Sequence, residues 1–313
     1  MNGAVIMLLA LVIDAGLGWP AALYARIGHP VTWMGAVISV LDRHLNRDDA
    51  PDALRRATGL VAALLVIGVS TAAGWIAASL LPGGWAGAVL TGFLAWPLVA
   101  ARSMHDHVAA VARPLTSGDL DAARLAVSMI VGRDPRQLDA AGVGRAATES
   151  LAENTSDGIV APIFWGVLLG LPGIAAYKAI NTLDSMIGHR TPRHEAFGLA
   201  SARIDDCANL VPARLTGFLF AAVSIRPRAA LATMWRDAHH HRSPNAGWPE
   251  AAMAGALGVR LSGPRIYAGL VAEEPWVNDG NPDPGPGDLN LALALYRRAM
   301  LVLAGGLVLL AAI

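Results

Sequence analysis

The sequence has little charge, one cysteine and one lysine, and each shortage excludes a class of protein. Only 15% of its 313 residues are charged, against about 25% in an average soluble domain. Hydrophobic residues make up 54% of the chain. So few charges cannot cover the surface of a water-soluble enzyme of this size. The composition therefore predicts a membrane protein with several spans and argues against a disordered chain.

The scarce residue types exclude particular sites. The single cysteine, Cys207, rules out an intrachain disulfide and a cysteine-based metal cluster. The single lysine, Lys178, follows Tyr177, so the Gly-Lys-Ser/Thr of a P-loop is missing. Acidic and basic residues balance at 24 each, which leaves no basic field to favour nucleic acid. No basic residue precedes the first apolar run, and we expect no cleaved signal peptide.

Long uncharged runs predict the spans. Residues 58–81 and 85–101 carry no charge, and a span needs about 20 residues. A Pro-Gly-Gly turn separates them, which predicts a transmembrane hairpin over residues 58–101. An apolar tail, residues 289–313, predicts a C-terminal transmembrane helix. Because arginines flank the hairpin but not its turn, we expect the flanks in the cytosol.

The other regions complete an all-α prediction. A polar region, residues 102–157, is expected to form two or three cytosolic amphipathic helices with breaks near 116–118 and 134–135, and residues 32–45 another amphipathic helix. The apolar run 159–171 is short and contains Pro162, which favours a re-entrant or protein-buried segment. We expect a single polytopic domain over residues 1–313. Its site-bearing core is residues 158–225, followed by a polar region at 226–288.

Three carboxylates stand directly before the short apolar run. Glu149, Glu153 and Asp157 are four residues apart and would share one side of a helix. Like charges so placed repel by roughly 0.2–0.5 kcal/mol per pair. The stripe suits cations, either a hard metal ion or arginine side chains. A solvated face, with Glu149 paired to Arg145, remains the alternative.

Two further polar clusters follow. Lys178, Asn181 and Asp184 recur every three residues and would share a helical stripe. Arg190 and Arg193 come next in a predicted loop, and guanidinium groups bind phosphate oxygens in pairs.

The third cluster lies within 12 residues and consists of Arg203, Asp205, Asp206, Asn209 and Arg214. Carboxylates and cations together suit a magnesium ion bound to phosphates. A buried ion-pair network that fixes helix packing is the alternative. Ionisable groups beside apolar runs are costly unless they are used, which favours a functional site.

Isolated candidates are weaker. His29 lies near the N-terminus, where single residues are more often structural. The run His239–His241 ends a predicted helix, and the helix macrodipole favours solvated histidine there, so we predict no metal site from it. Asn245 lies in a Ser-Pro-Asn turn.

Five sequence blocks carry a resemblance to a known family. The blocks are GHPVTWMG (28–35), ESLAENTSDGIVAPIFW (149–165), YKAINTLDSMIGHR (177–190), ARIDDCANLVPARLTG (202–217) and SPNAGWPEAAMAGAL (243–257). In this order they resemble the CobD/CbiB family, the membrane-bound adenosylcobinamide-phosphate synthases of cobalamin biosynthesis. The chain departs from the family at Trp19, where the family usually has aspartate. That acidic residue is therefore not essential here.

The resemblance implies an ATP-dependent amide ligation. Adenosylcobyric acid would be joined to an amino-alcohol phosphate, usually (R)-1-amino-2-propanol phosphate, to give adenosylcobinamide phosphate. A carboxylate is a poor acyl donor, so ATP would convert it to an acyl phosphate that the amine attacks. The implied cofactors are ATP and Mg²⁺, since phosphoryl transfer depends on positioning and charge stabilisation.

Roles for the candidate residues follow from this reaction. We expect Glu149, Glu153, Asp157 and Asp184 to act in catalysis. Residues for ATP and phosphate are Lys178, Arg190, Arg193, Arg203 and Arg214. Substrate contacts are assigned to His29, Asn154, Asn181, Asn209 and Asn245. Asp205 and Asp206 are the expected metal ligands. All of these side chains are expected to converge in one pocket that cytosolic ATP can reach.

The expected partners are the corrinoid, the amino-alcohol phosphate and the lipid bilayer, with no nucleic acid. Other cobalamin-pathway enzymes and a second copy of the chain are further candidates. The expected location is the bacterial inner membrane, with the site facing the cytosol. Three rival interpretations stay open: a transporter of a small anionic solute, a membrane prenyl- or phosphatidyl-type transferase, and a non-catalytic signalling protein.

Overall fold

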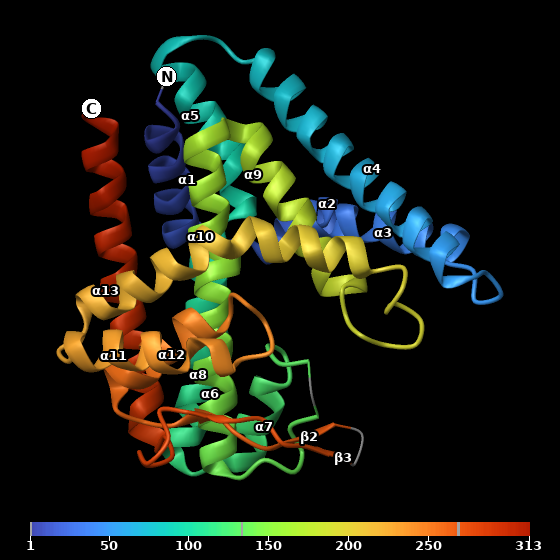
Figure 1. Cartoon of the computed structure of the whole chain (residues 1–313). Helices are drawn as coiled ribbons and strands as arrows, with labels where there is room; N and C mark the ends of the chain where they lie inside the picture. The colour runs from blue at the N-terminus through green and yellow to red at the C-terminus, as the bar shows by residue number, and fades with distance from the viewer. Residues whose placement is uncertain (1, 133, 268–269) are drawn as a thin grey trace. The chain divides into compact units, whose positions relative to one another are not determined.

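The computed structural model describes residues 2–132, 134–267 and 270–313, and these are mostly helical (Figure 1). The first helices are α1 (Gly3–Leu17), α2 (Ala21–Ile27), α3 (Pro30–Leu45), α4 (Asp52–Ser79), α5 (Gly84–Ala95), α6 (Ala101–Ser117) and α7 (Leu120–Val127). They are followed by α8 (Ala140–Thr155), α9 (Ala161–Ile187), α10 (Leu199–Val223), α11 (Pro227–Asp237), α12 (Gly247–Leu257) and α13 (Pro286–Ala311). Short 3₁₀ turns lie at Trp96–Leu98 and Ala238–His240, and a π-helical turn lies at Ser156–Val160.

Four short strands interrupt the polar region predicted at 226–288. Strand β1 (Leu261–Ser262) pairs antiparallel with β4 (Trp276–Val277). Strand β2 (Arg265–Tyr267) pairs antiparallel with β3 (Leu270–Ala272). Elements of two or three residues carry no readable alternation, which is why the sequence did not reveal them.

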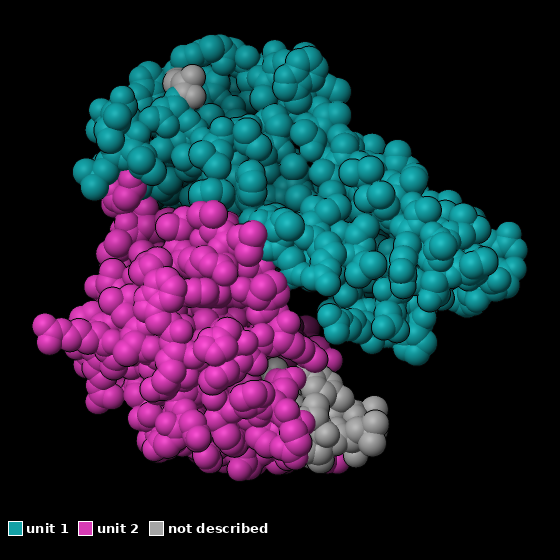
Figure 2. All heavy atoms as spheres, in the orientation of Figure 1, with its two compact units in different colours: residues 1–100, 161–209, 307–313 teal, residues 101–160, 210–306 magenta. Residues whose placement is uncertain are grey.

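The chain divides into two compact units, which Figure 2 colours separately. Unit 1 consists of residues 1–100, 161–209 and 307–313, and unit 2 of residues 101–160 and 210–306. Unit 1 contains α1 to α5, α9 and the first part of α10. Unit 2 contains α6 to α8, α11, α12 and most of α13.

Membrane spans are present as predicted. Among the described residues, four helical stretches are long and apolar enough to cross a membrane: Asp52–Ser79, Gly84–Ser117, Ala140–Ile187 and Pro286–Ala311. The bent pair Gly3–Leu17 and Ala21–Leu45, with an angle of 108°, would make a fifth. Each predicted span, at 58–81, 85–101 and 289–313, falls mostly within one of these stretches. The chain is therefore an all-α, multi-pass membrane protein.

Two details refine the sequence-based prediction. The predicted hairpin helices α4 and α5 follow one another, but α4 packs mainly on α9 and α5 mainly on α1; α4 leans away from α5 in Figure 1. The run 159–171 is helical and lies within the longer stretch Ala140–Ile187; its first residues, Ile159 to Ile163, are buried, which agrees with the protein-buried alternative. Pro162 does not end it because proline is tolerated in a first helical turn, and a kink at Gly170 (φ 68°) precedes Pro172.

Helices are present where the amphipathic helices were predicted. Helix α3 covers residues 30–45, and the polar region 102–157 contains α6, α7 and α8. Asp119 and Asp139 cap α7 and α8 by accepting hydrogen bonds from backbone N–H groups of the first turn. These caps explain why both helices begin where they do.

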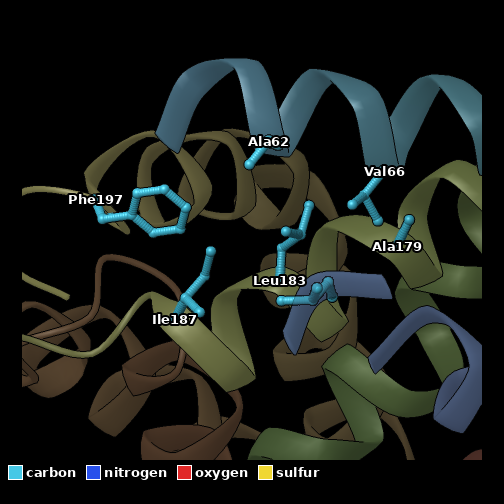
Figure 3. Packing of buried hydrophobic residues seen from close by; sticks show 8 residues of the cluster. Ala62, Val66, Ala179, Leu183, Ile187 and Phe197 are labelled. Carbon is cyan, nitrogen blue, oxygen red and sulfur yellow. The ribbon is translucent and has the colours of Figure 1, made fainter. Parts of the chain in front are cut away.

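A buried apolar cluster in unit 1 holds α9 against α3 and α4 (Figure 3). Its members are Ile38, Ala62, Ala63, Val66, Ala179, Leu183, Ile187 and Phe197. Leu183 and Ile187 of α9 lie below Ala62 and Val66 of α4 in Figure 3. Since α9 also carries the predicted polar stripe, this cluster fixes the position of that stripe.

Close contact at this cluster requires a glycine. A Cβ atom added to Gly59 of α4 would collide with the carbonyl oxygen of Phe197. By contrast, a Cβ atom on Gly68 of the same helix would meet nothing within 4 Å.

We predict that Gly59→Ala destabilises the protein, because backbone atoms cannot yield as a flexible side chain can. The expected loss in free energy of unfolding is about 1–3 kcal/mol. Gly68→Ala is the matched control and should leave stability unchanged or raise it by up to about 1 kcal/mol, through helix propensity. Thermal unfolding in detergent measures both, and equal behaviour of the two variants would contradict the packing described.

Candidate functional site

One residue of the predicted stripe on α9, Asp184, lies near a carboxylate of α10. Lys178, Asn181 and Asp184 all lie on α9, as the spacing indicated. Asp184 is half-buried, and it lies close enough to Asp206 for the two carboxylates to repel each other. Gly188 leaves room for this arrangement, because a Cβ atom there would strike the Asp184 carboxylate. Two acidic groups from separate helices are thus brought together.

Two arginines accompany this acidic pair. Arg203 Nη1 lies 3.6 Å from Asp206 Oδ2, and Arg190 also attracts the Asp206 carboxylate. Burial raises the pKa of Asp206 above its usual value, and Arg203 and Arg190 oppose that rise only in part. Both arginine side chains are exposed, so their guanidinium groups face water as well as the acidic pair. We call Asp184, Asp206, Arg190 and Arg203 the α9–α10 cluster.

Asp205 points to a different environment from its neighbour Asp206. Its Oδ2 accepts a hydrogen bond of 2.9 Å from the Asn209 amide, whose Oδ1 accepts one of 2.8 Å from the Tyr177 hydroxyl. All three side chains are buried. Successive residues of a helix project about 100° apart, which explains why the two aspartates diverge. Tyr177 was missed by the sequence analysis, because a buried tyrosine on an apolar helix resembles a core residue.

His29 lies near the buried Lys178. The two groups interact electrostatically, and the His29 side chain also caps α3 by accepting from the Val31 N–H at 3.2 Å. Trp19 packs edge-on against the His29 ring at 4.9 Å and donates a hydrogen bond to the Gly28 carbonyl. Trp19 therefore contacts a candidate site residue directly.

Arg193 is bound by other carboxylates. It forms an ion pair of 3.1 Å with Asp42 and a longer one of 3.4 Å with Asp48, while its own carbonyl accepts from Arg55 and Asn46. The guanidinium of Arg193 is thus used in fixing the loop before α10 to α3.

The acidic stripe of α8 lies in unit 2 and is only partly regular. Glu149 is buried and accepts a hydrogen bond of 2.7 Å from the backbone N–H of Ser262. Arg145, the alternative partner considered for it, is ion-paired with Asp283. Asp157 falls in the π-helical turn Ser156–Val160, which displaces it from the four-residue repeat of Glu149 and Glu153. Such turns are frequent at functional sites.

Asn154 is the exposed member of this segment. Its amide nitrogen donates to the carbonyl of Ser150, one turn earlier in α8, at 2.9 Å. The side chain of Asn154 therefore lies back along its own helix, and the predicted contact of Asn154 with substrate stays a prediction.

Arg214 and Asn245 are brought together in unit 2, as the prediction of a shared site requires. Arg214 Nη1 donates to Asn245 Oδ1 at 3.4 Å and to the Leu210 carbonyl at 2.6 Å. Its guanidinium lies 4.4 Å from the ring centre of Trp248, a cation–π contact. Burial lowers the pKa of Arg214 from its usual value. Trp248 was not a sequence candidate, although it lies in the same block as Asn245.

The histidine run has two environments. His239 and His240 are exposed at the end of α11, as predicted, but the His241 side chain is only 9% exposed and faces Glu250 at 3.8 Å. The macrodipole argument therefore fails for His241. Its position beside a buried carboxylate follows from tertiary packing, which no local pattern encodes.

The described residues contain no group of side chains that would bind a metal ion without further ligands. Within residues 2–132, 134–267 and 270–313, no three or more His, Cys, Asp or Glu residues are grouped so as to hold a metal ion. Mg²⁺ typically uses one or two carboxylates together with substrate phosphates and water. The Asp184–Asp206 pair fits that need, whereas a structural zinc site would need four ligands.

A cavity of about 540 Å³ in unit 2 contains none of the predicted residues. It is lined by Arg236, Asp237, His240, Pro275, Trp276 and Asp279. The predicted site residues are divided between unit 1 and unit 2. Their convergence in a single pocket stays a prediction.

Comparison with known proteins finds relatives that match over most of the chain. A family model described as CobD/Cbib protein matches residues 7–296. A protein of Rhodobacter capsulatus named cobalamin biosynthesis protein CobD is 66% identical over 300 residues, covering 96% of this chain and 95% of that protein. Proteins of the same name from a Sinorhizobium species and from Brucella suis biovar 1 are 48% and 46% identical, each covering 96% of this chain and 95% and 94% of their own lengths. No solved structure matches.

The chain therefore belongs to the CobD/CbiB family of membrane proteins. The match covers most of the chain and includes α3, α8, α9, α10 and α12, the elements that carry the clusters described above.

We predict that Asp206→Asn stabilises the protein at neutral pH. A raised pKa means that the folded state disfavours the charged form, so the cost is present above the pKa of folded Asp206 and disappears as the group is protonated. Because the group is partly exposed, the gain in Tm should be small, on the order of 1–2 °C at pH 7. It should shrink as the pH falls and vanish at about pH 3, below the ordinary pKa of aspartate.

Thermal unfolding of both proteins at the two pH values measures this difference. Asp121→Asn, on α7, is the control; its ion pair with Arg124 is exposed to solvent, so its Tm should stay close to that of the wild type at both pH values. A lower Tm for Asp206→Asn at pH 7 would mean that Arg203 and Arg190 outweigh burial.

Proposed function

We propose that the chain is an ATP-dependent amide ligase of cobalamin biosynthesis, which joins adenosylcobyric acid to an amino-alcohol phosphate and yields adenosylcobinamide phosphate. Membership of the CobD/CbiB family and the names of its relatives support the pathway. The α9–α10 cluster is the observation that supports the ATP-dependent chemistry, because it combines two carboxylates with two exposed arginines.

In the proposed reaction a carboxylate oxygen of the corrinoid attacks the γ-phosphorus of ATP. The bond to ADP breaks, and an acyl phosphate forms. The amine nitrogen then attacks the acyl carbon and phosphate leaves, while a base takes the proton released by the amine. ATP is thereby converted to ADP and phosphate for each amide bond formed.

The α9–α10 cluster is assigned the nucleotide. Asp184 and Asp206 would hold Mg²⁺, which neutralises phosphate charge during transfer. Arg190 and Arg203 would bind phosphate oxygens bidentately. Asp205 was expected to be a second metal ligand beside Asp206. Because the two diverge on α10, we assign Asp205 to the hydrogen-bonded chain with Asn209 and Tyr177.

Other residues are assigned to the substrates. Lys178 would attract the phosphoryl group or the corrinoid carboxylate, and His29 beside it would accept the proton of the amine. Arg214 and Asn245 would bind the phosphate of the amino alcohol. Glu153 and Asp157, on either side of the start of the π-helical turn, would orient the ammonium group.

An assay with purified protein tests the proposal. We expect mass spectrometry to detect amide formation from adenosylcobyric acid, Mg²⁺–ATP and (R)-1-amino-2-propanol phosphate, with one ADP released per amide. Asp184→Asn and Asp206→Asn should each lower kcat by about 100-fold or more, the loss typical when transition-state charge stabilisation is removed.

Asp121→Asn is again the matched control and should retain wild-type turnover. Transport of an anionic solute into proteoliposomes without ATP hydrolysis would contradict the ligase and support a transporter. Amide formation that is unchanged in Asp184→Asn and Asp206→Asn would retain the ligase but remove the α9–α10 cluster from its site.

We further propose that the α9–α10 cluster faces the cytosol from the bacterial inner membrane, since the nucleotide is cytosolic. The chain offers its own reporter, because Cys207 is its single cysteine, is exposed and directly follows Asp206. A membrane-impermeant maleimide should label Cys207 in inverted membrane vesicles and not in intact spheroplasts.

Cys207→Ser is the control and should show no labelling in either preparation. Labelling from the periplasmic side in spheroplasts would contradict the orientation without bearing on the chemistry.

A further inference from the structure

A buried pair of ionisable side chains lies next to Asn245 in the sequence and outside the reaction described above. His241 Nε2 and Glu250 Oε1 are 3.8 Å apart, and the side chains are 9% and 2% exposed. Glu250 lies in the first turn of α12, and His241 lies in the loop that leads to it. Burying a carboxylate is costly unless it is well bound, so this pair serves a purpose in the fold or at a site.

The contacts of His241 fix its protonation pattern. The backbone N–H of Ser243 donates to His241 Nδ1 at 3.0 Å, so Nδ1 acts as the acceptor. The ring proton of the neutral side chain is then on Nε2, which faces Glu250. The imidazole thus lies between the Glu250 carboxylate, 3.8 Å from Nε2, and the loop backbone, and it is a clamp between them rather than an exposed base.

This clamp is continuous with the environment of Asn245. Ser243 Oγ accepts hydrogen bonds of 3.3 Å from the N–H groups of Asn245 and Ala246. Asn245 is 5% exposed, so its amide has little freedom to turn. The loop from His241 to Asn245 is therefore held at one end by Glu250, and at the other end it presents the side-chain oxygen Oδ1 of Asn245.

Arg214 contacts this loop directly and also through Trp248. Its guanidinium donates to Asn245 Oδ1 and lies over Trp248, whose indole N–H donates to the Pro244 carbonyl at 3.2 Å. Pro244 and Asn245 both belong to the clamped loop. Two of the groups that orient the guanidinium thus depend on the His241–Glu250 pair.

We propose that His241 and Glu250 are positioning residues that hold Arg214 in register to bind the phosphate monoester of the amine substrate. This inference rests on the ligase function proposed above. A guanidinium binds a phosphate in a fixed planar geometry, and a misplacement of about 1 Å at such a contact has large effects on binding and rate. The pair acts through Arg214 and does not touch the substrate itself.

The test compares a phosphorylated amine with its unphosphorylated form. In His241→Gln and Glu250→Gln, the KM for (R)-1-amino-2-propanol phosphate should rise about tenfold while kcat changes less than about threefold. The KM values for ATP, for adenosylcobyric acid and for free 1-amino-2-propanol should stay at wild-type values. Arg214→Lys keeps the charge but loses the planar fork, and it should show the same selective change.

A second measurement does not need turnover. The rise in Tm caused by (R)-1-amino-2-propanol phosphate alone, without ATP or corrinoid, should be reduced in all three variants. His239→Ala, at the exposed neighbour of the run, is the matched control and should behave as wild type in both measurements.

The outcomes separate this inference from the ligase proposal. A wild-type protein that forms no amide removes the ligase function, and with it the basis of the inference. An active wild type whose variants keep the KM for the phosphorylated amine overturns the positioning role alone. Equal losses for all substrates in His241→Gln and Glu250→Gln would reveal a purely structural pair and also overturn it, and an unchanged KM in Arg214→Lys would do the same.

Discussion

Neighbouring helices pack so closely on α9 that, at their glycine residues, their backbones contact the backbone of α9. A Cβ atom on Gly3 of α1 would collide with the carbonyl oxygen of Val167, and one on Gly74 of α4 would lie 2.8 Å from that of Leu171. Lipid offers no hydrophobic drive for helices to associate, so they rely on close packing through small residues. Since α9 also carries Lys178, Asn181 and Asp184, this packing sets the positions of the chemistry-bearing side chains.

Much of this architecture could be predicted because its signals are local. Uncharged runs indicated the spans, and three-residue spacing indicated the stripe that α9 carries. Tertiary contacts were out of reach. The partner of α4 is α9 rather than the adjacent α5, because small residues such as Ala62 and Gly74 lie against α9, a helix distant in the sequence. Helical geometry alone predicts that Asp205 and Asp206 project in different directions. Which of the two lies near Asp184 depends on how α10 is rotated against α9, and the sequence does not show this rotation.

The candidate residues that sequence reasoning missed share one physical trait. Tyr177, Trp248, His241 and Glu250 act on neighbours distant along the chain or across a turn, so no spacing marks them. Their residue types are also common elsewhere: tyrosine and tryptophan occur in apolar cores, and histidine and glutamate occur on surfaces. Glu149 shows how a candidate can also have a structural contact, because its position in an acidic repeat suggested catalysis and one of its oxygens accepts a hydrogen bond from the backbone of Ser262. A sequence of low charge uses its few ionised groups for architecture as well as for chemistry.

The π-helical turn at Ser156–Val160 has a consequence for the segments it joins. A π turn amounts to one extra residue wound into an α-helix, and one residue corresponds to a rotation of about 100°. Asp157, which lies inside the turn, is consequently out of phase with Glu149 and Glu153 of α8. Removing a single residue there would restore a regular helix and change the direction in which Asp157 projects relative to those two carboxylates. The length of this segment is therefore constrained as strictly as the identity of its side chains.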